Sequence, residues 1–206
     1  SQGNSVVAIG RQAGELSQVS GSVAIGYYAG NQNQGLCSVA VGQEAGFTGQ
    51  GGLAVSVGNL AGNTSQRPSS VAVGYASGFN KQGGTGVSGG RSIAIGAEAG
   101  FESQEGQAIA IGFLSGRWNQ RTGSISIGTS SGQTNQSIYA VAIGVQAGCQ
   151  NQASRSIAIG LQAGFTGQSN ETVAIGYQSG FNNQGAWATA VGNLAGSISQ
   201  GSEAVA

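Results

Sequence analysis

The feature that most constrains this chain is a 16-residue repeat that runs along almost its whole length. A glycine and a glutamine return at fixed places in every repeat. Two leading residues, twelve repeats, a six-residue insertion and a six-residue partial repeat account for all 206 residues. A period this short and regular predicts one coil per repeat, with each coil stacked on the next.

Two ladders of identical residues mark the period. The eighth position of the repeat is glycine: Gly10, Gly26, Gly42, Gly58, Gly74, Gly96, Gly112, Gly128, Gly144, Gly160, Gly176 and Gly192. The sixteenth position is glutamine: Gln18, Gln34, Gln50, Gln66, Gln82, Gln104, Gln120, Gln136, Gln152, Gln168, Gln184 and Gln200. A second glycine follows four residues after the first. We expect the glycines where the backbone needs a positive φ or a close approach, and the glutamine amides stacked along the axis, each donating to the next.

A segment that reads approximately S-V-A-I-G alternates strictly in each repeat. Its fifth and seventh repeat positions are Val or Ile in 23 of 24 cases, with Thr189 the exception, and the residue between them is Ala or Ser. This alternation predicts a strand with one β-branched face and one small face. Sixteen residues fit two short strands and two turns. We therefore predict an all-β fold, a β-solenoid (β-roll) of about twelve 16-residue coils spaced about 4.8 Å apart.

The repeats are interpreted as one continuous domain. Residues 1–82 form coils 1–5, residues 83–88 an inserted loop, and residues 89–206 coils 6–12 plus a partial coil. We expect the Val and Ile rows to be buried and the Ser/Ala row to form a flat outer face. Such a face allows close approach of a second solenoid, and an ice- or surface-binding role for the same face is the alternative. The predicted face includes Ser22, Ala24, Ser38, Ala40, Ser92, Ala94, Ser156 and Ala158.

Composition excludes several classes of function. The chain has 7 basic and 7 acidic residues, no His and no Asp. Ser-His-Asp and Cys-His nucleophiles, His-ligated metals and Asp-based calcium loops are therefore excluded. Zero net charge argues against nucleic-acid binding, no apolar stretch approaches the ~20 residues of a membrane helix, and no signal peptide is recognisable. We expect a protein that is not an enzyme and that has no cofactor, metal, nucleic-acid partner or membrane insertion.

Three motifs suggest catalysis but have simpler explanations. Glu98, Glu102 and Glu105 are the nearest approach to the paired carboxylates of a glycosidase, but a solvated turn aided by Arg91, Arg117 and Arg121 is favoured. The stretch from Gly84 through Gly86 to Gly89 matches the dinucleotide fingerprint, a match expected by chance among 40 glycines. Ser88 and Ser130 lie in G-x-S-x-G patterns, but the chain offers no His as base.

The remaining candidates are individual residues. Cys37 and Cys149 are six repeats apart, roughly 29 Å, so they are free thiols or intermolecular bridges, and incidental cysteines are favoured. Asn63, Asn135 and Asn170 begin N-glycosylation sequons, and their use is left open. A partly exposed aromatic row at the thirteenth position suits subunit contact, carbohydrate stacking or packing between coils: Phe47, Phe79, Phe101, Phe165 and Phe181.

The segments V-A-I-G-Y-Y-A-G (23–30), S-I-A-I-G-L-Q-A-G-F (156–165) and T-V-A-I-G-Y-Q-S-G-F (172–181) resemble the YadA-like head repeats of trimeric autotransporter adhesins. They also look like the I-G-x-x-A-G repeats of phage and virus tail-fibre proteins. The adhesin resemblance implies a left-handed β-roll, a homotrimer and attachment to host or matrix surfaces. This chain differs in its longer period and its glutamine ladder. The 16-residue period is also similar to that of the bacterial ice-nucleation family, without its Thr-x-Thr rows or tyrosine ladder.

Together these observations predict a structural, non-enzymatic fibre or filament subunit outside the cell or on a cell or virion surface. We expect self-assembly through flat small-residue faces, open solenoid ends or both, as a trimer or an end-to-end filament. No capping repeat is recognisable at either end, which suggests a piece of a longer protein or end-to-end stacking. A surface or glycan ligand is a further expectation.

Overall fold

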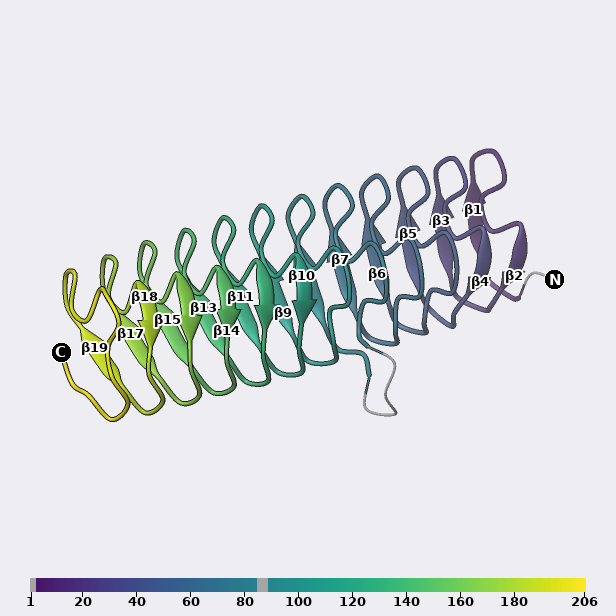
Figure 1. Ribbon diagram of the computed structural model, residues 1–206. Coiled ribbons are helices and arrows are strands. Elements are labelled where there is room, and N and C mark those ends of the chain that lie inside the picture. The colour runs from purple at the N-terminus through teal and green to yellow at the C-terminus, as the bar shows by residue number, and fades with distance from the viewer. Residues whose placement is uncertain (1–2, 85–88) are drawn as a thin grey trace.

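The chain folds as a long, straight β-solenoid, in a computed structural model that describes residues 3–84 and 89–206 (Figure 1). The described residues contain strands and turns and no helix. Twelve strands stack in the main sheet, so the rod makes about eleven turns of roughly 16 residues from the first strand to the last. The predicted all-β solenoid is therefore confirmed, and the two ends of the chain lie at opposite ends of the rod.

The main sheet is parallel and uses the fifth to seventh positions of each repeat. Every residue pairs with the residue one repeat later, as in the pair Val7 and Val23. Across the insertion, Val71 pairs directly with Ile93, so the parallel register of the sheet continues without a break. The strands stack in the order β1 (Val7–Ile9), β3 (Val23–Ile25), β5 (Val39–Val41), β6 (Val55–Val57), β7 (Val71–Val73), β8 (Ile93–Ile95), β9 (Ile109–Ile111), β11 (Ile125–Ile127), β13 (Val141–Ile143), β15 (Ile157–Ile159), β17 (Val173–Ile175) and β19 (Thr189–Val191).

The opposite wall of the rod is formed by the fourteenth to sixteenth positions. Single bridges, such as that between Thr48 and Thr64, continue this wall where no full strand forms. Each second strand ends at the ladder glutamine, as the repeat predicts. The strands are β2 (Leu16–Gln18), β4 (Gln32–Gln34), β10 (Trp118–Gln120), β12 (Thr134–Gln136), β14 (Gln150–Gln152), β16 (Thr166–Gln168) and β18 (Asn182–Gln184).

The core between the two walls consists of small residues and glutamine. Alanines at the sixth and eleventh positions pack into clusters, for example Ala24 with Ala29 and Ala40. Buried Ser, Ala or Thr fills the fourth position of every complete coil after the first, which has the partly exposed Val6 there. Eleven ladder glutamines and Thr172 are the largest fully buried side chains of the described residues. A narrow interior of this kind has no room for a layer of Val or Ile.

The buried glutamines form the predicted amide ladder. Gln136 Nε2 donates to Ile125 O at 2.8 Å and to Gln152 Oε1 at 3.2 Å, and Gln136 Oε1 accepts from Gln120 Nε2 at 3.2 Å. Such bonds link the ladder in three runs, residues 34–82, 104–152 and 168–200. The Oε1 atoms of Gln34, Gln104 and Gln168 begin these runs without a hydrogen-bond partner. The ladder therefore has a direction, with donors pointing toward the C-terminal end.

The glycine ladder is needed for both conformation and space. Gly128 has φ 123°, and a Cβ atom added to it would lie 2.7 Å from Gly144 O in the next coil. The sequence did not predict the non-glycine residues with positive φ, which recur at the third, tenth and fifteenth positions. Asn119 and Asn135 at the fifteenth position fit this pattern, because Asn tolerates the left-handed region better than most residues.

The strand faces point the opposite way from our expectation. All eight residues of the predicted small-residue face are fully buried: Ser22, Ala24, Ser38, Ala40, Ser92, Ala94, Ser156 and Ala158. The Val and Ile rows of the same strands lie on the outer surface, as in Ile143, which is 36% exposed. The reason is steric, since the small residues face the glutamine ladder across a narrow interior. The expectations of a buried Val/Ile core and a flat outer Ser/Ala face are therefore wrong.

The insertion leaves and rejoins the solenoid at one turn. Gly83 N donates to Gln104 O at 2.7 Å, and Gly90 N donates to Gly83 O at 2.8 Å. These bonds join the two ends of the inserted segment next to the rod. Gly86 and Ser88, and with them the matches to a nucleotide fingerprint and a nucleophile elbow, lie outside the described residues.

Candidate interaction surfaces

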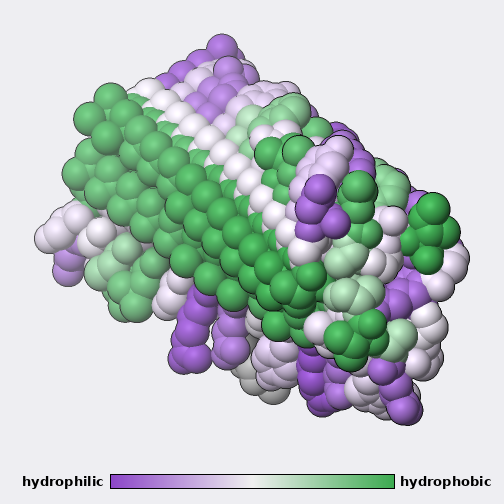
Figure 2. All heavy atoms as spheres, turned by 90° about the vertical axis from the view of Figure 1, so that its left-hand side faces the viewer, coloured by the Kyte–Doolittle hydropathy of each residue, from purple (hydrophilic) through white to green (hydrophobic). Residues whose placement is uncertain are grey.

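The outer face of the main sheet carries two continuous rows of apolar side chains, here called the Val/Ile face. It consists of the fifth and seventh positions of the twelve repeats, which are Val or Ile except at Thr189. The fifth-position side chains are partly exposed, with Val7 at the end of the rod more exposed than the others. The seventh-position side chains are at most 59% exposed, at Ile9. Figure 2 shows the result as a continuous apolar band along the rod. No charged side chain interrupts either row.

The Val/Ile face is large for an isolated molecule. Eleven steps between twelve strands give a length of about 53 Å, and the two rows lie about 6.6 Å apart. With the width of the side chains this gives on the order of 600 Å², at the upper end of the apolar patches that monomeric proteins expose. A copy stacked on it would bury about 600 Å² per partner, the lower end of the range for stable interfaces.

The ninth position adds an apolar border beyond the glycine row. Six of its members are among the exposed large hydrophobic residues: Tyr27, Tyr75, Phe113, Val145, Leu161 and Tyr177. The glycine row between this border and the Val/Ile face has no side chains, so it leaves the surface open to a close neighbour.

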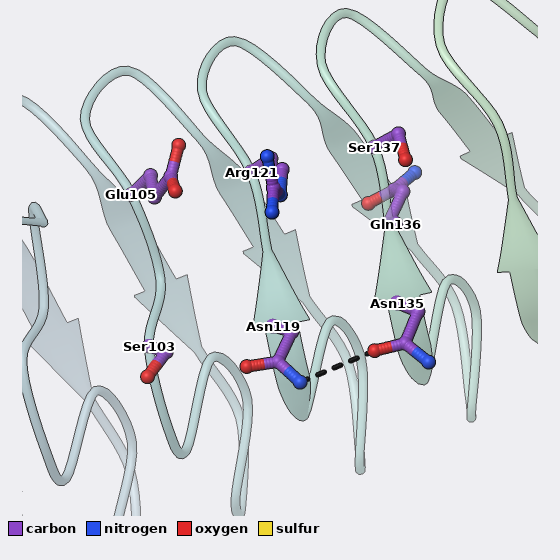
Figure 3. A pocket seen from close by; sticks show the side chains of 7 residues that line it. All are labelled: Ser103, Glu105, Asn119, Arg121, Asn135, Gln136 and Ser137. Atoms are coloured by element: carbon purple, nitrogen blue, oxygen red, sulfur yellow. Dashed lines mark hydrogen bonds between the residues drawn. The ribbon is translucent and has the colours of Figure 1, made fainter.

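A polar groove of about 530 Å³ runs along the opposite side of the coil, where the backbone turns at the ladder glutamine (Figure 3). Because the glutamine points inward, the residues before and after it form two separate rows. One row contains Ser103, Asn119 and Asn135, and the other contains Glu105, Arg121 and Ser137. Asn119 Nδ2 donates to Asn135 Oδ1 at 3.1 Å, and Asn135 continues the ladder to Asn151 at 3.0 Å.

The structure gives separate partners to carboxylates that suggested a glycosidase. Glu98 pairs with Arg117 at 2.5 Å. Glu105 Oε2 accepts from Thr122 N at 3.0 Å and from Thr122 Oγ1 at 2.7 Å. Glu102 lies in the second wall, bridged to its neighbours through the backbone. These contacts are those of structural turn residues, and they do not form a shared acid–base pair.

The aromatic row at the thirteenth position packs on itself along the rod. Phe79 stacks on Phe101 at 5.0 Å between ring centroids, and Phe165 stacks on Phe181 at 5.1 Å. Arg117 covers this row, with its guanidinium carbon 5.7 Å from the Phe101 ring. Packing between coils, one of the three predicted uses of the row, is therefore observed.

The other single-residue candidates are dispersed. Cys37 and Cys149 are both free thiols, and burial raises the pKa of the Cys149 thiol. Asn63 is buried and donates to Glu44 O at 3.0 Å, whereas Asn135 and Asn170 are exposed. Ser130 lies in a turn, where its backbone N donates to Phe113 O at 2.9 Å.

Metal clusters and membrane-spanning helices are both absent from the described residues. Residues 3–84 and 89–206 contain no group of three or more Cys or Glu side chains placed to hold a metal ion. In the same part of the chain, no helix is long and apolar enough to cross a membrane.

Sequence reasoning missed a second hollow, of about 300 Å³, on the turn that precedes the main strand. Its main side chains are Tyr139, Arg155, Glu171 and Trp187, from the third position of four successive coils. Their spacing of 16 residues, read from the sequence, already predicts that these four side chains lie in one row. Comparison with known proteins gives no match to this chain, among family models, curated proteins or solved structures.

Proposed function

We propose that this chain is a structural, non-enzymatic subunit of an extracellular fibre or filament, and that it assembles with copies of itself through the Val/Ile face. The observation that carries the proposal is the position of the Val and Ile rows on the outside of the rod. An apolar surface of this size is unfavourable in water, so its burial against another surface drives association.

Several properties of the Val/Ile face favour a second copy as its occupant. The rows carry no charge and repeat every coil, so another copy of the same face has the same spacing and the same chemistry. Ridges of β-branched side chains on one copy can lie in the grooves between the rows of another, as in dry sheet interfaces. Two facing copies would bury about 1,200 Å² in total, which is the lower end of the range for stable interfaces.

Two further observations support a structural protein outside the cell or on a virion. The absence of His from the sequence and the separate partners of Glu98 and Glu105 favour a structural role over catalysis. The resemblance of its strand motifs to adhesin head repeats and tail-fibre repeats supports a place outside the cell or on a virion. The alternative of an ice-binding Ser/Ala face has no support, because those residues are buried.

The test compares two lysine substitutions in the same coil. Ile143→Lys places a charge on the Val/Ile face, whereas Gln150→Lys places one on the opposite wall at an exposed position. We expect the parent chain and Gln150→Lys to sediment as oligomers. For Ile143→Lys we expect a dissociation constant of the oligomer at least tenfold higher than that of the parent chain. Circular dichroism melting establishes that both variants fold. A parent chain that is monomeric at every concentration, or an Ile143→Lys variant that assembles like the parent, contradicts the proposal.

A further inference from the structure

The hollow of about 300 Å³ on the turn before the main strand, here called the third-position cleft, combines aromatic, charged and polar side chains. Successive coils place Tyr139, Arg155, Glu171 and Trp187 in one row about 4.8 Å apart, beside Ser154 and Asn170 in the neighbouring row. Tyr139 and Trp187 therefore lie three coils apart, roughly 14 Å. The cleft between the two rows opens to solvent.

The centre of the cleft is a preorganised pair of charged groups. Arg155 Nη1 donates to Glu171 Oε1 at 2.9 Å, and Trp187 Nε1 donates to Glu171 Oε2 at 3.1 Å. Both carboxylate oxygens are held, so the plane of the carboxylate is fixed. The Arg155 and Glu171 side chains remain 68% and 43% exposed, which leaves donors and acceptors of both groups facing the cleft.

The two aromatic residues supply exposed ring surface at either end. Tyr139 is 57% exposed and Trp187 is 59% exposed. The Tyr139 ring lies over Gly123, because a Cβ atom added there would be 2.6 Å from two of its ring carbons. Glycine at this position therefore makes room for the ring. The Trp187 indole is restrained differently, by the hydrogen bond that its Nε1 donates to Glu171 Oε2.

These groups select a particular ligand chemistry. The one cation and the one anion of the cleft neutralise each other, so a charged ligand gains no net attraction and has to compete with the pair. Exposed aromatic rings bind apolar C–H surface, while the guanidinium, carboxylate and amide groups bind neighbouring hydroxyls. A neutral sugar ring combines these two features.

We propose that this cleft binds a neutral saccharide, with sugar rings on Trp187 and Tyr139 and hydroxyl groups on Arg155 and Glu171. The site extends beyond one sugar, because Ser137 at the end of the polar groove in Figure 3 directly precedes Ile138 and Tyr139 of the cleft. The groove is polar and carries the oppositely charged Glu105 and Arg121. The two hollows together suit a glycan chain that lies along the rod.

The test uses the full chain, labelled and applied to an array of neutral and anionic oligosaccharides, followed by titration with the best neutral binder. We expect binding to neutral oligosaccharides, and a loss of at least tenfold in affinity for Trp187→Ala and for Tyr139→Ala. Trp187→Phe keeps an aromatic ring but loses the hydrogen bond from the indole Nε1 to Glu171. It should therefore retain more affinity for the oligosaccharide than Trp187→Ala. Leu53→Ala is the matched control, because Leu53 is an exposed third-position residue in a distant coil.

The readout is independent of assembly. Ile143→Lys should bind the same oligosaccharide with the affinity of the parent chain, since the Val/Ile face is not part of the cleft. Melting curves establish that each variant is folded. The proposal is overturned if the array shows no neutral binder, if only sulfated or sialylated sugars bind, or if Trp187→Ala binds as tightly as Leu53→Ala.

Discussion

Each buried glutamine acts as a connector between coils as well as a core residue. Its amide nitrogen donates to a backbone carbonyl of its own coil and, within a run, to the next glutamine, as Gln120 does to Ile109 O at 2.7 Å and to Gln136 Oε1 at 3.2 Å. A buried amide without hydrogen-bond partners costs roughly 1–3 kcal/mol. Each glutamine within a run therefore depends on its neighbours in the ladder for its hydrogen bonds. The variation at the sixth position follows this logic, since Ser126 donates its hydroxyl to the amide oxygen of Gln136.

The first prediction concerns one member of the ladder. Gln136→Ala removes the amide and leaves Ile125 O and Gln120 Nε2 with fewer partners around a new cavity. We expect the free energy of unfolding to fall by about 3 kcal/mol. Denaturant titration measures the change, with Gln150→Ala, an exposed glutamine of the next coil, as the control. Equal stability of the two variants would show that the ladder contributes little.

At the scale of the strand, the order of residue types was predictable and the direction of the faces was not. Alternation identifies Val141 and Ile143 as neighbours on one face, with Ala142 on the other, but it is symmetrical about the strand. The width of the interior decides between the two faces, and that width depends on how closely the second wall approaches. Gln136 and Gln152 occupy that space, so only Ala or Ser fits opposite them.

The 16-residue repeat predicted the candidate surfaces only in part. The residues of the Val/Ile face were identified from sequence, but on the wrong side of the strand. The row from Tyr139 to Trp187 follows from the 16-residue spacing, yet each residue type there differs, so no single repeat indicates a site. The positive φ at this position also has no sequence signal in Tyr139, Arg155 or Trp187, because the stacked turns impose it.

The second prediction tests the close contact between consecutive turns. Gly128→Ala forces a Cβ atom to within 2.7 Å of Gly144 O at a φ of 123°, where L-residues are strained. We expect a loss of at least ~2 kcal/mol in the free energy of unfolding. Gly201→Ala should be nearly neutral, because no atom lies within 4 Å of its added Cβ. If thermal melting finds both variants as stable as the parent, the stacking of glycine on glycine is not a constraint.

At the scale of the whole molecule, stability and assembly use different chemistry. The interior is held by hydrogen bonds among Gln, Ser and backbone groups, while the apolar side chains that usually form a core lie outside. In the proposed function, this outer hydrophobic surface is buried between associated molecules. Its length then follows from the number of coils, since each coil contacts only its neighbours.

The third prediction concerns the one interruption of this one-dimensional order. Deleting residues 83–88 restores a continuous 16-residue period in the sequence, while the coils of Gln82 and Gln104 are already paired in register through the bridge between Asn80 and Glu102. Because β7 and β8 already pair across the insertion, the rod needs no rearrangement. We expect the free energy of unfolding to rise by about 0.5 kcal/mol, because the deletion removes a loop whose closure costs entropy. Deleting six residues within a coil, 137–142, removes two of the three residues of β13 and shifts the later ladders out of phase, so that variant should lose cooperative melting. A deletion of 83–88 that lowers stability would mean that the insertion supports the coils beside it, and the rod would then be two segments joined by a structural element rather than one uninterrupted stack.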